Sequence, residues 1–226
     1  MQPTIYQDTL PATEKPKAAW PLLHGLLYLV FAIGLFVAVP VLRAWPWFWI
    51  APLAAYHFLV FTVPWLRRSF RPVRLGTITR WGVAATAVIS IVAAAALVIF
   101  HITMKPDVRI LGATLPVKAM GGIIAGGVIF SLLNAILEEW VFRGIFFNSV
   151  EPHLGRWWAV LIPSLIFGLA HQQGYPPGAL GMLLSGIYAV ALGWLRVSSG
   201  GLALPIASHI VADATIYLVL AREGVL

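Results

Sequence analysis

Residues 132–150 read LLNAILEEWVFRGIFFNSV and place two adjacent carboxylates, Glu138 and Glu139, and one guanidinium, Arg143, inside an otherwise apolar run. An ionisable group at membrane depth costs about 2.5–3.5 kcal/mol on insertion scales. A chain that keeps three such groups so close together either pairs them with one another or uses them. The surroundings of this stretch therefore bear on both the fold and the function.

The composition of the chain indicates an integral membrane protein. Its 226 residues are 60% hydrophobic and 10% charged, and the mean hydropathy is +0.89. Soluble domains carry about 25% charged residues. Several apolar runs reach about 20 residues, the length of a helix that crosses the hydrocarbon core of a bilayer. We therefore predict an all-α, polytopic transmembrane bundle of about seven helices, some of them short or re-entrant.

The basic residues set the expected orientation. A net charge of +7 would suggest nucleic acid in a soluble protein, but here the basic residues lie mainly between the apolar runs. By the positive-inside rule the densest cluster, RRSFRPVR at 67–74, faces the cytoplasm, and the N-terminus lies on the same side. A site for phospholipid headgroups is the alternative for this cluster. We expect a multi-pass protein of the cell (plasma) membrane whose partners include membrane lipids but no nucleic acid.

The chain is expected to form one domain. Residues 1–19 are polar and lack periodicity, which predicts a disordered tail, and no repeat or linker divides residues 20–226. The absence of cysteine excludes disulfides, thiolate metal ligands and a cysteine nucleophile. The predicted apolar helices cover residues 21–42, 47–66, 78–100, 119–150, 158–171, 179–197 and 202–221.

The segments that connect these helices are predicted to form a loop, a turn and a tryptophan-rich belt at the membrane interface. Residues 101–118 are predicted to form a loop, and residues 151–158 a turn. Tryptophan is enriched where helices meet the membrane surface. Trp45, Trp47 and Trp49 are therefore predicted to form an interfacial belt.

The helical phase separates the two carboxylates. Glu139 and Arg143 are four residues apart and lie on nearly the same helix face, whereas Glu138 lies about 100° around from Glu139. Glu138 shares its stripe with Asn134 and Ser131. The spacing predicts that Arg143 neutralises Glu139 and that Glu138 keeps neutral polar neighbours, which suits a general base or acid. The alternative is a buried ion pair that fixes helix register, with Glu138 hydrogen-bonded to a neighbouring helix.

Two histidines fall in the same half of the chain as the carboxylates. His171 and His209 lie in or at the edge of apolar helices, and Asp213 follows His209 by one helical turn. Imidazoles and carboxylates together can activate a water molecule, either directly or through a divalent metal such as zinc. The metal alternative would use Glu138 with these three residues as ligands. The remaining histidines are expected near the membrane interface; they are His24, His57, His101 and His153.

Three motifs carry a resemblance to a known family. EEWVFRG at 138–144 is similar to EExxxR, FGLAH at 167–171 to FxxxH, and PIASHIVAD at 205–213 to HxxxN/D. These motifs occur in this order in the intramembrane proteases of the CAAX protease and bacteriocin-processing (CPBP, "Abi") family. The similarity covers roughly residues 119–221 and not the first three predicted helices.

The resemblance implies an intramembrane endopeptidase, CAAX-protease-like, with a polar cavity open to the cytoplasm. By position, Glu138 would activate the hydrolytic water, and Glu139 with Arg143 would be the supporting pair. His171 would bind or orient the water. The substrate would be a peptide or protein, such as a lipidated or membrane-anchored one. A metalloendopeptidase is compatible with this set of donors, although the zinc motif HExxH is absent.

One position departs from the commoner family pattern. The resemblance gives His209 and residue 213 the tasks of stabilising the oxyanion or completing the site, but Asp213 stands where Asn is frequent. An ionised Asp cannot donate a hydrogen bond to an oxyanion, so it suits orienting His209 or binding a metal, whereas a protonated Asp could still donate. The alternatives for the whole chain are a proton-coupled transporter and a catalytically silent scaffold or immunity protein. A transporter would usually show internal repeats, and none is visible.

Overall fold

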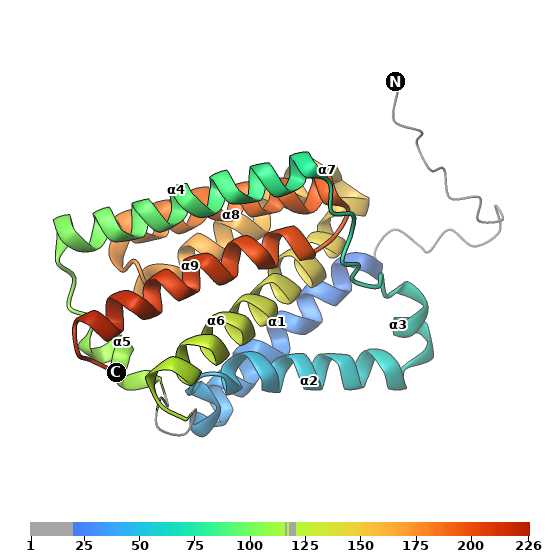
Figure 1. Cartoon of the computed structure of the whole chain (residues 1–226). Helices are drawn as coiled ribbons and strands as arrows, with labels where there is room; N and C mark the ends of the chain where they lie inside the picture. The colour runs from blue at the N-terminus through green and yellow to red at the C-terminus, as the bar shows by residue number, and fades with distance from the viewer. Residues whose placement is uncertain (1–19, 116, 118–120) are drawn as a thin grey trace.

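All regular elements in the computed structural model, which describes residues 20–115, 117 and 121–226, are helical (Figure 1). The predicted tail at 1–19 lies outside the described residues. The elements are α1 Trp20–Ala38, η1 Pro40–Arg43, α2 Trp47–Thr62, α3 Pro64–Ser69, α4 Arg80–Met104, α5 Arg109–Thr114, α6 Ile123–Glu139, η2 Trp140–Phe146, α7 Phe147–Ala170, η3 His171–Gln173, α8 Gly178–Ser199 and α9 Ala203–Arg222.

The prediction of an all-α polytopic bundle with about seven helices is confirmed. Apart from the six-residue helices α3 and α5, the described α-helices are 16 to 25 residues long. Five helical segments are long and apolar enough to cross a membrane, and one of them, Ile123–Ala170, has 48 residues, enough for two passes. Large apolar side chains are exposed on the outside, among them Ile33, Ile91 and Ile187 at 61–68%. Soluble monomers rarely expose such patches, so this surface faces lipid.

The predicted helix at 119–150 is divided in the structure. The α-helix α6 ends at Glu139, and the next seven residues, Trp140–Phe146, form the wider π-helix η2 before α7 begins. The expected loop at 101–118 likewise contains a short helix, α5. Neither feature changes the apolar pattern of the sequence, so hydrophobic periodicity alone does not reveal them.

The predicted turn at 151–158 is reduced to a single residue. Gly155 has φ 78° and ψ 174°, a backbone conformation that is essentially restricted to glycine. The chain reverses direction at this residue. The evidence is that the rings of Phe142, thirteen residues before it, and Phe167, twelve residues after it, lie only 5.0 Å apart between centroids. This hairpin brings the EExxxR and FxxxH motifs to the same level.

The long helices pack in a bundle in which α9 lies between α4 and α6, while α7 packs along α8 and α1 along α2 and α7 (Figure 1). This order places the three motif-bearing segments next to one another. The motif helices therefore form the centre of the bundle, and α1, α2 and α4 lie around them.

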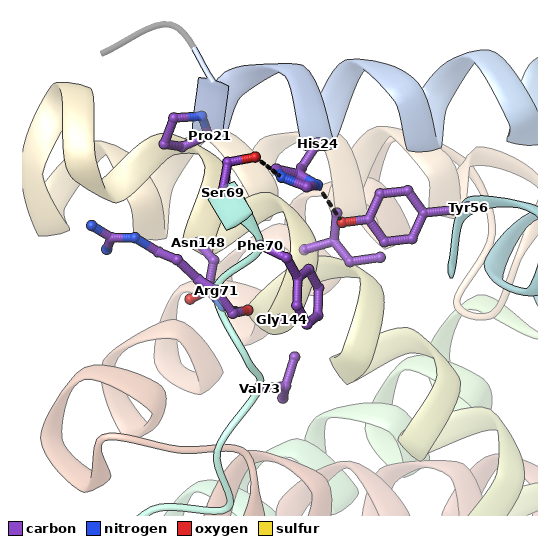
Figure 2. Close-up of a pocket in the computed structure, with 10 residues that line it drawn as sticks. Pro21, His24, Tyr56, Ser69, Phe70, Arg71, Val73, Gly144 and Asn148 are labelled. Atoms are coloured by element: carbon purple, nitrogen blue, oxygen red, sulfur yellow. Dashed lines mark hydrogen bonds between the residues drawn. The ribbon is translucent and has the colours of Figure 1, made fainter. Parts of the chain in front are cut away.

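A buried histidine joins the first three helices. His24 of α1 is only 5% exposed and lies inside the helix packing. Its Nδ1 lies 2.9 Å from the hydroxyl of Tyr56 on α2, and its Nε2 lies 2.9 Å from the hydroxyl of Ser69 on α3 (Figure 2). The cavity beside them, about 10 Å³, is also lined by Val73 and Gly144, so this cluster abuts η2.

An extended segment, residues 70–79, ties the first half of the chain to the turn between α8 and α9. The backbone N–H groups of Leu202 and Ala203 donate to the carbonyls of Arg74 and Leu75 at 2.9 and 3.0 Å. These bonds satisfy donors at the start of α9, which no side chain caps. The segment therefore fixes where α9 begins.

Substitution of Gly201 by Ala should lower stability by about 1–3 kcal/mol, the usual cost of overpacking. A Cβ at this position would collide with the backbone of Leu75 and Gly76, and backbone cannot rotate away. The midpoint of thermal unfolding in detergent micelles measures the effect. Gly34→Ala is the matched control, because a Cβ there meets nothing within 4 Å and should cause no loss.

Candidate active site

The ion pair expected between Glu139 and Arg143 is present and fully buried. Nη1 of Arg143 donates to Oε1 of Glu139 at 2.8 Å, with side-chain exposures of 2% and 0%. Nη2 of Arg143 donates to the carbonyl of Ala189 on α8 at 2.9 Å. The guanidinium also lies 5.0 Å from the ring centroid of Phe167 on α7. Three separate segments of the chain therefore converge on this guanidinium.

The π-helix η2 positions Arg143. A π-helical turn is wider than an α-helical one, and short π segments recur at functional sites. The main-chain carbonyl of Arg143 accepts a hydrogen bond from Nε of Arg196, near the end of α8, at 3.3 Å. The widened turn thus connects both the side chain and the backbone of Arg143 to α8.

His209 links the ion pair to the other acidic residues. Its Nδ1 lies 2.7 Å from Oε1 of Glu139, and because an ionised carboxylate only accepts, Nδ1–H is the donor. Its Nε2 faces Oε2 of Glu138 at 3.6 Å and Oδ1 of Asp213 at 3.8 Å. Glu139 therefore selects the orientation of the imidazole, and Nε2 is directed toward the remaining two carboxylates.

Glu138 makes one hydrogen bond and keeps one oxygen without a partner. Its Oε1 accepts from Nδ2 of Asn134 at 3.0 Å, as the shared helix stripe predicts. The same Nδ2 lies 3.3 Å from Oδ2 of Asp213 on α9. Oε2 of Glu138 is buried and has no hydrogen-bond partner among the described residues. This oxygen is the one that faces Nε2 of His209.

His171 lies apart from this hydrogen-bonded set but lines the same cavity. Its Nδ1 lies 2.8 Å from the carbonyl of Phe167, to which Nδ1–H donates, and its ring lies 4.3 Å from the Phe167 ring. The Phe167 ring is also 5.9 Å from the His209 ring. The aromatic residue of the FxxxH motif thus separates and positions the two imidazoles.

The charges of the cluster do not balance if every carboxylate is ionised. Glu138, Glu139 and Asp213 contribute three negative charges, while the guanidinium of Arg143 and a protonated His209 contribute two positive charges. Like charges at short range in a water-poor site cannot all remain ionised without cost. One of these carboxylates can therefore hold a proton at low cost in this arrangement.

A large apolar cavity of about 450 Å³ adjoins these side chains. Ligand pockets usually measure about 300–1,000 Å³. Val88 and Val92 of α4 and Ile187 of α8 line the cavity and are 61–62% exposed, so it reaches the molecular surface beside these helices. Its polar or titratable lining residues are Trp45, Asn134, Glu138, His171, Tyr175, Ser185, Tyr188, His209 and Asp213.

The proposed metal ligands do not group into a metal site. Within 20–115, 117 and 121–226, no three His, Asp or Glu side chains are arranged to hold a metal ion. Asn134 contacts one oxygen of Glu138 and one of Asp213, and His171 uses Nδ1 for the carbonyl of Phe167. The donors therefore do not fit zinc in this arrangement, and the chemistry proposed below uses the side chains alone.

Sequence reasoning missed one contributor to the site. Trp45 was expected in an interfacial belt, but it is only 7% exposed, and its Nε1–H donates to Oδ1 of Asn134 at 3.2 Å. The partners are 89 residues apart, so no local spacing signals the contact. Trp47, by contrast, is 52% exposed, as an interfacial residue would be.

Comparisons with known proteins bear on the same part of the chain. Residues 120–215 match the family model described as Type II CAAX prenyl endopeptidase Rce1-like. Neither a curated protein nor a solved structure matches the chain significantly. All six predicted site residues, from Glu138 to Asp213, lie inside the matched segment. Residues 120–215 are therefore similar to the Rce1-like CAAX proteases, the family that the three motifs predicted.

Proposed function

We propose that the protein is an intramembrane endopeptidase in which Glu138 activates a water molecule for attack on a peptide carbonyl. The observation that carries this proposal is the buried, unpartnered Oε2 of Glu138, which lies beside Nε2 of His209 at the wall of the large cavity. A general base needs a free acceptor within reach of the proton that it removes. The match of residues 120–215 to a protease family supports the same chemistry.

In the first step, water bound at the cavity wall gives a proton to Oε2 of Glu138, and its oxygen forms a bond to the peptide carbonyl carbon. His171, through Nε2, helps to orient this water, since its Nδ1 is engaged by the carbonyl of Phe167. The negative charge that develops on the carbonyl oxygen is stabilised by the protonated imidazole of His209. Glu139, clamped by Arg143, holds that imidazole in place.

In the second step the tetrahedral intermediate collapses. The bond between the carbonyl carbon and the amide nitrogen breaks, and the leaving nitrogen takes the proton that Glu138 removed from the water. Glu138 returns to the carboxylate form, so protons and charge balance over the cycle. Asp213, 3.8 Å from His209, orients the imidazole.

The cavity defines the kind of substrate that the site would accept. Apart from its polar residues, its lining is formed mainly by aliphatic and aromatic side chains, including those of Phe48, Ile89 and Ile216. Such a lining suits a peptide or protein substrate that carries a lipid or another large apolar group. A prenylated C-terminus is one substrate of this class, and the family description names it.

The orientation of the protein in the membrane follows from the basic segment. Arg67, Arg68, Arg71 and Arg74 are exposed at one end of the bundle, and this same segment binds the start of α9. We propose that this end and the N-terminus face the cytoplasm of a plasma-membrane protein, according to the positive-inside rule.

Replacement of Glu138 by Gln should lower kcat for peptide cleavage by about 10²–10⁴-fold, because the amide cannot accept the proton from water. The assay uses full-length protein in liposomes with internally quenched peptides ending in a CAAX sequence, with and without a farnesyl group. Glu151→Gln is the matched control, since Glu151 is a partly exposed carboxylate that forms an ion pair with Arg71, and the variant should cleave at the wild-type rate. Equal cleavage by wild type and Glu138→Gln would contradict the proposal, and proton-coupled uptake of a solute would favour the transporter instead.

The role of Asp213 can be separated from that of the base. Asp213→Asn should retain activity within about tenfold of wild type, because the amide oxygen still accepts from Asn134 and the side chain keeps its shape and position beside His209. Asp213→Leu should lose about 10–100-fold, as typical for the loss of an orienting partner. If both variants are equally inactive, a carboxylate at position 213 is required for the chemistry itself.

Removal of divalent metals should leave cleavage unchanged. The donors around Glu138 do not group into a metal site, so the proposed steps need no metal. Initial rates are compared before and after dialysis against EDTA and 1,10-phenanthroline. A loss of activity that added zinc restores would show that a metal acts in the reaction and would overturn this part of the mechanism.

A further inference from the structure

An amide side chain bridges the two carboxylates that lie on different helices. Asn134 of α6 is buried at 7% exposure. Its Nδ2 lies 3.0 Å from Oε1 of Glu138, on its own helix, and 3.3 Å from Oδ2 of Asp213 on α9. A side-chain amide carries two N–H donors, so each carboxylate can receive one of them. Both donors of this amide are therefore directed to acidic residues of the site.

The orientation of that amide is set by a residue far away in the sequence. Nε1–H of Trp45, in the connection before α2, donates to Oδ1 of Asn134 at 3.2 Å. Indole is only a donor, so it requires the oxygen end of the amide to face it. A flipped amide would place N–H against N–H at Trp45 and oxygen against oxygen at the carboxylates. The indole and the carboxylates thus select the same orientation.

We infer that Asn134, locked by Trp45, is a positioning residue that holds the carboxylates of Glu138 and Asp213 in their working geometry. The inference rests on the proposed function, because it assigns a task within that site. Asn134 engages Oε1 of Glu138, and the other oxygen of the same carboxylate, Oε2, is directed at Nε2 of His209. The N–H donors of the amide also lie between the carboxylates of Glu138 on α6 and Asp213 on α9, and they weaken the repulsion between these two groups.

The positioning role is specific to this amide. The charged or titratable groups that surround the bridged pair are Glu139, Arg143, His171 and His209. Among the described residues, Asn134 is the donor to Oε1 of Glu138 and to Oδ2 of Asp213, so loss of the amide removes the hydrogen bond of both oxygens. Trp45 lies outside the matched segment 120–215, and its ring packs 5.5 Å from Phe130 of α6.

The test measures kcat and KM separately for wild type, Asn134→Leu, Trp45→Phe and the double variant, with the farnesylated, quenched CAAX peptide in liposomes. Asn134→Leu should lower kcat by about 10–100-fold with little change in KM. Trp45→Phe keeps the aromatic ring but removes the donor, and should lower kcat by about 3–10-fold. Because Trp45 acts through Asn134, the double variant should be no slower than Asn134→Leu alone.

The control is Ser131→Ala, a buried polar residue one turn earlier on α6 whose hydroxyl donates to the carbonyl of Gly127. It should leave kcat unchanged. Unchanged kcat in folded Asn134→Leu, or losses in the single variants that multiply in the double variant, would overturn the inference. Thermal melting identifies any variant that fails to fold, and Trp45→Phe supplies the milder change if Asn134→Leu does not fold.

A second readout needs no cleavage and separates this inference from the proposed function. Infrared bands of the Glu138 and Asp213 carboxyl groups are assigned by their loss in Glu138→Gln and Asp213→Asn. They should shift in Trp45→Phe, because the indole N–H donates to Asn134, which in turn donates to both carboxyl groups. If Glu138→Gln cleaves like wild type, the peptidase proposal fails, while a shifted band still supports the positioning role. Unshifted bands in Trp45→Phe overturn the positioning role alone.

Discussion

The buried ion pair between Arg143 and Glu139 is the constraint on which the arrangement of the other elements depends. A guanidinium and a carboxylate removed from water lose several kcal/mol of hydration each, and their attraction offsets this loss only if further hydrogen bonds satisfy both groups. Here the additional partners are the carbonyl of Ala189 and the imidazole of His209. The pair therefore requires α8 and α9 to lie against η2, and this requirement defines the centre of the bundle.

The same pair determines the chemistry of the imidazole. Because Glu139 receives Nδ1–H of His209, Nε2 must point away from the ion pair and toward Glu138 and Asp213. Two adjacent carboxylates on one helix thus have different environments. Oε1 of Glu139 lies between two cationic groups, whereas Glu138 accepts from the neutral amide of Asn134 and lines the cavity.

Local spacing predicts part of this site well. The i,i+4 relation gives the bond between Arg143 and Glu139, and the same relation in the other direction gives the bond between Asn134 and Glu138. Both bonds form because the members of each pair are four residues apart and therefore lie within about one helical turn of each other. The grouping of His209 with the carboxylates follows from the motif order, which an apolar pattern by itself would not provide.

The remaining features depend on tertiary structure or on single residues. The π-helix η2 leaves the apolar pattern of 119–150 unchanged, and the reversal at Gly155 depends on one residue rather than on a loop of eight. The burial of Trp45 depends on tertiary packing, because tryptophan suits a membrane interface and a buried hydrogen-bonded site equally well. Its partner lies 89 residues away, beyond any window in which periodicity can be read.

The first half of the chain takes part in the site although it lies outside the matched segment. Trp45 contacts the amide that bridges the two carboxylates, and the extended segment 70–79 satisfies backbone donors at the start of α9, six residues before His209. The buried cluster around His24 holds α1, α2 and α3 together beside η2 (Figure 2). The matched segment supplies the reactive groups, but their orientation relies on contacts from the other helices. A fragment limited to 120–215 would lack both the indole that locks Asn134 and the backbone acceptors that fix the position of α9.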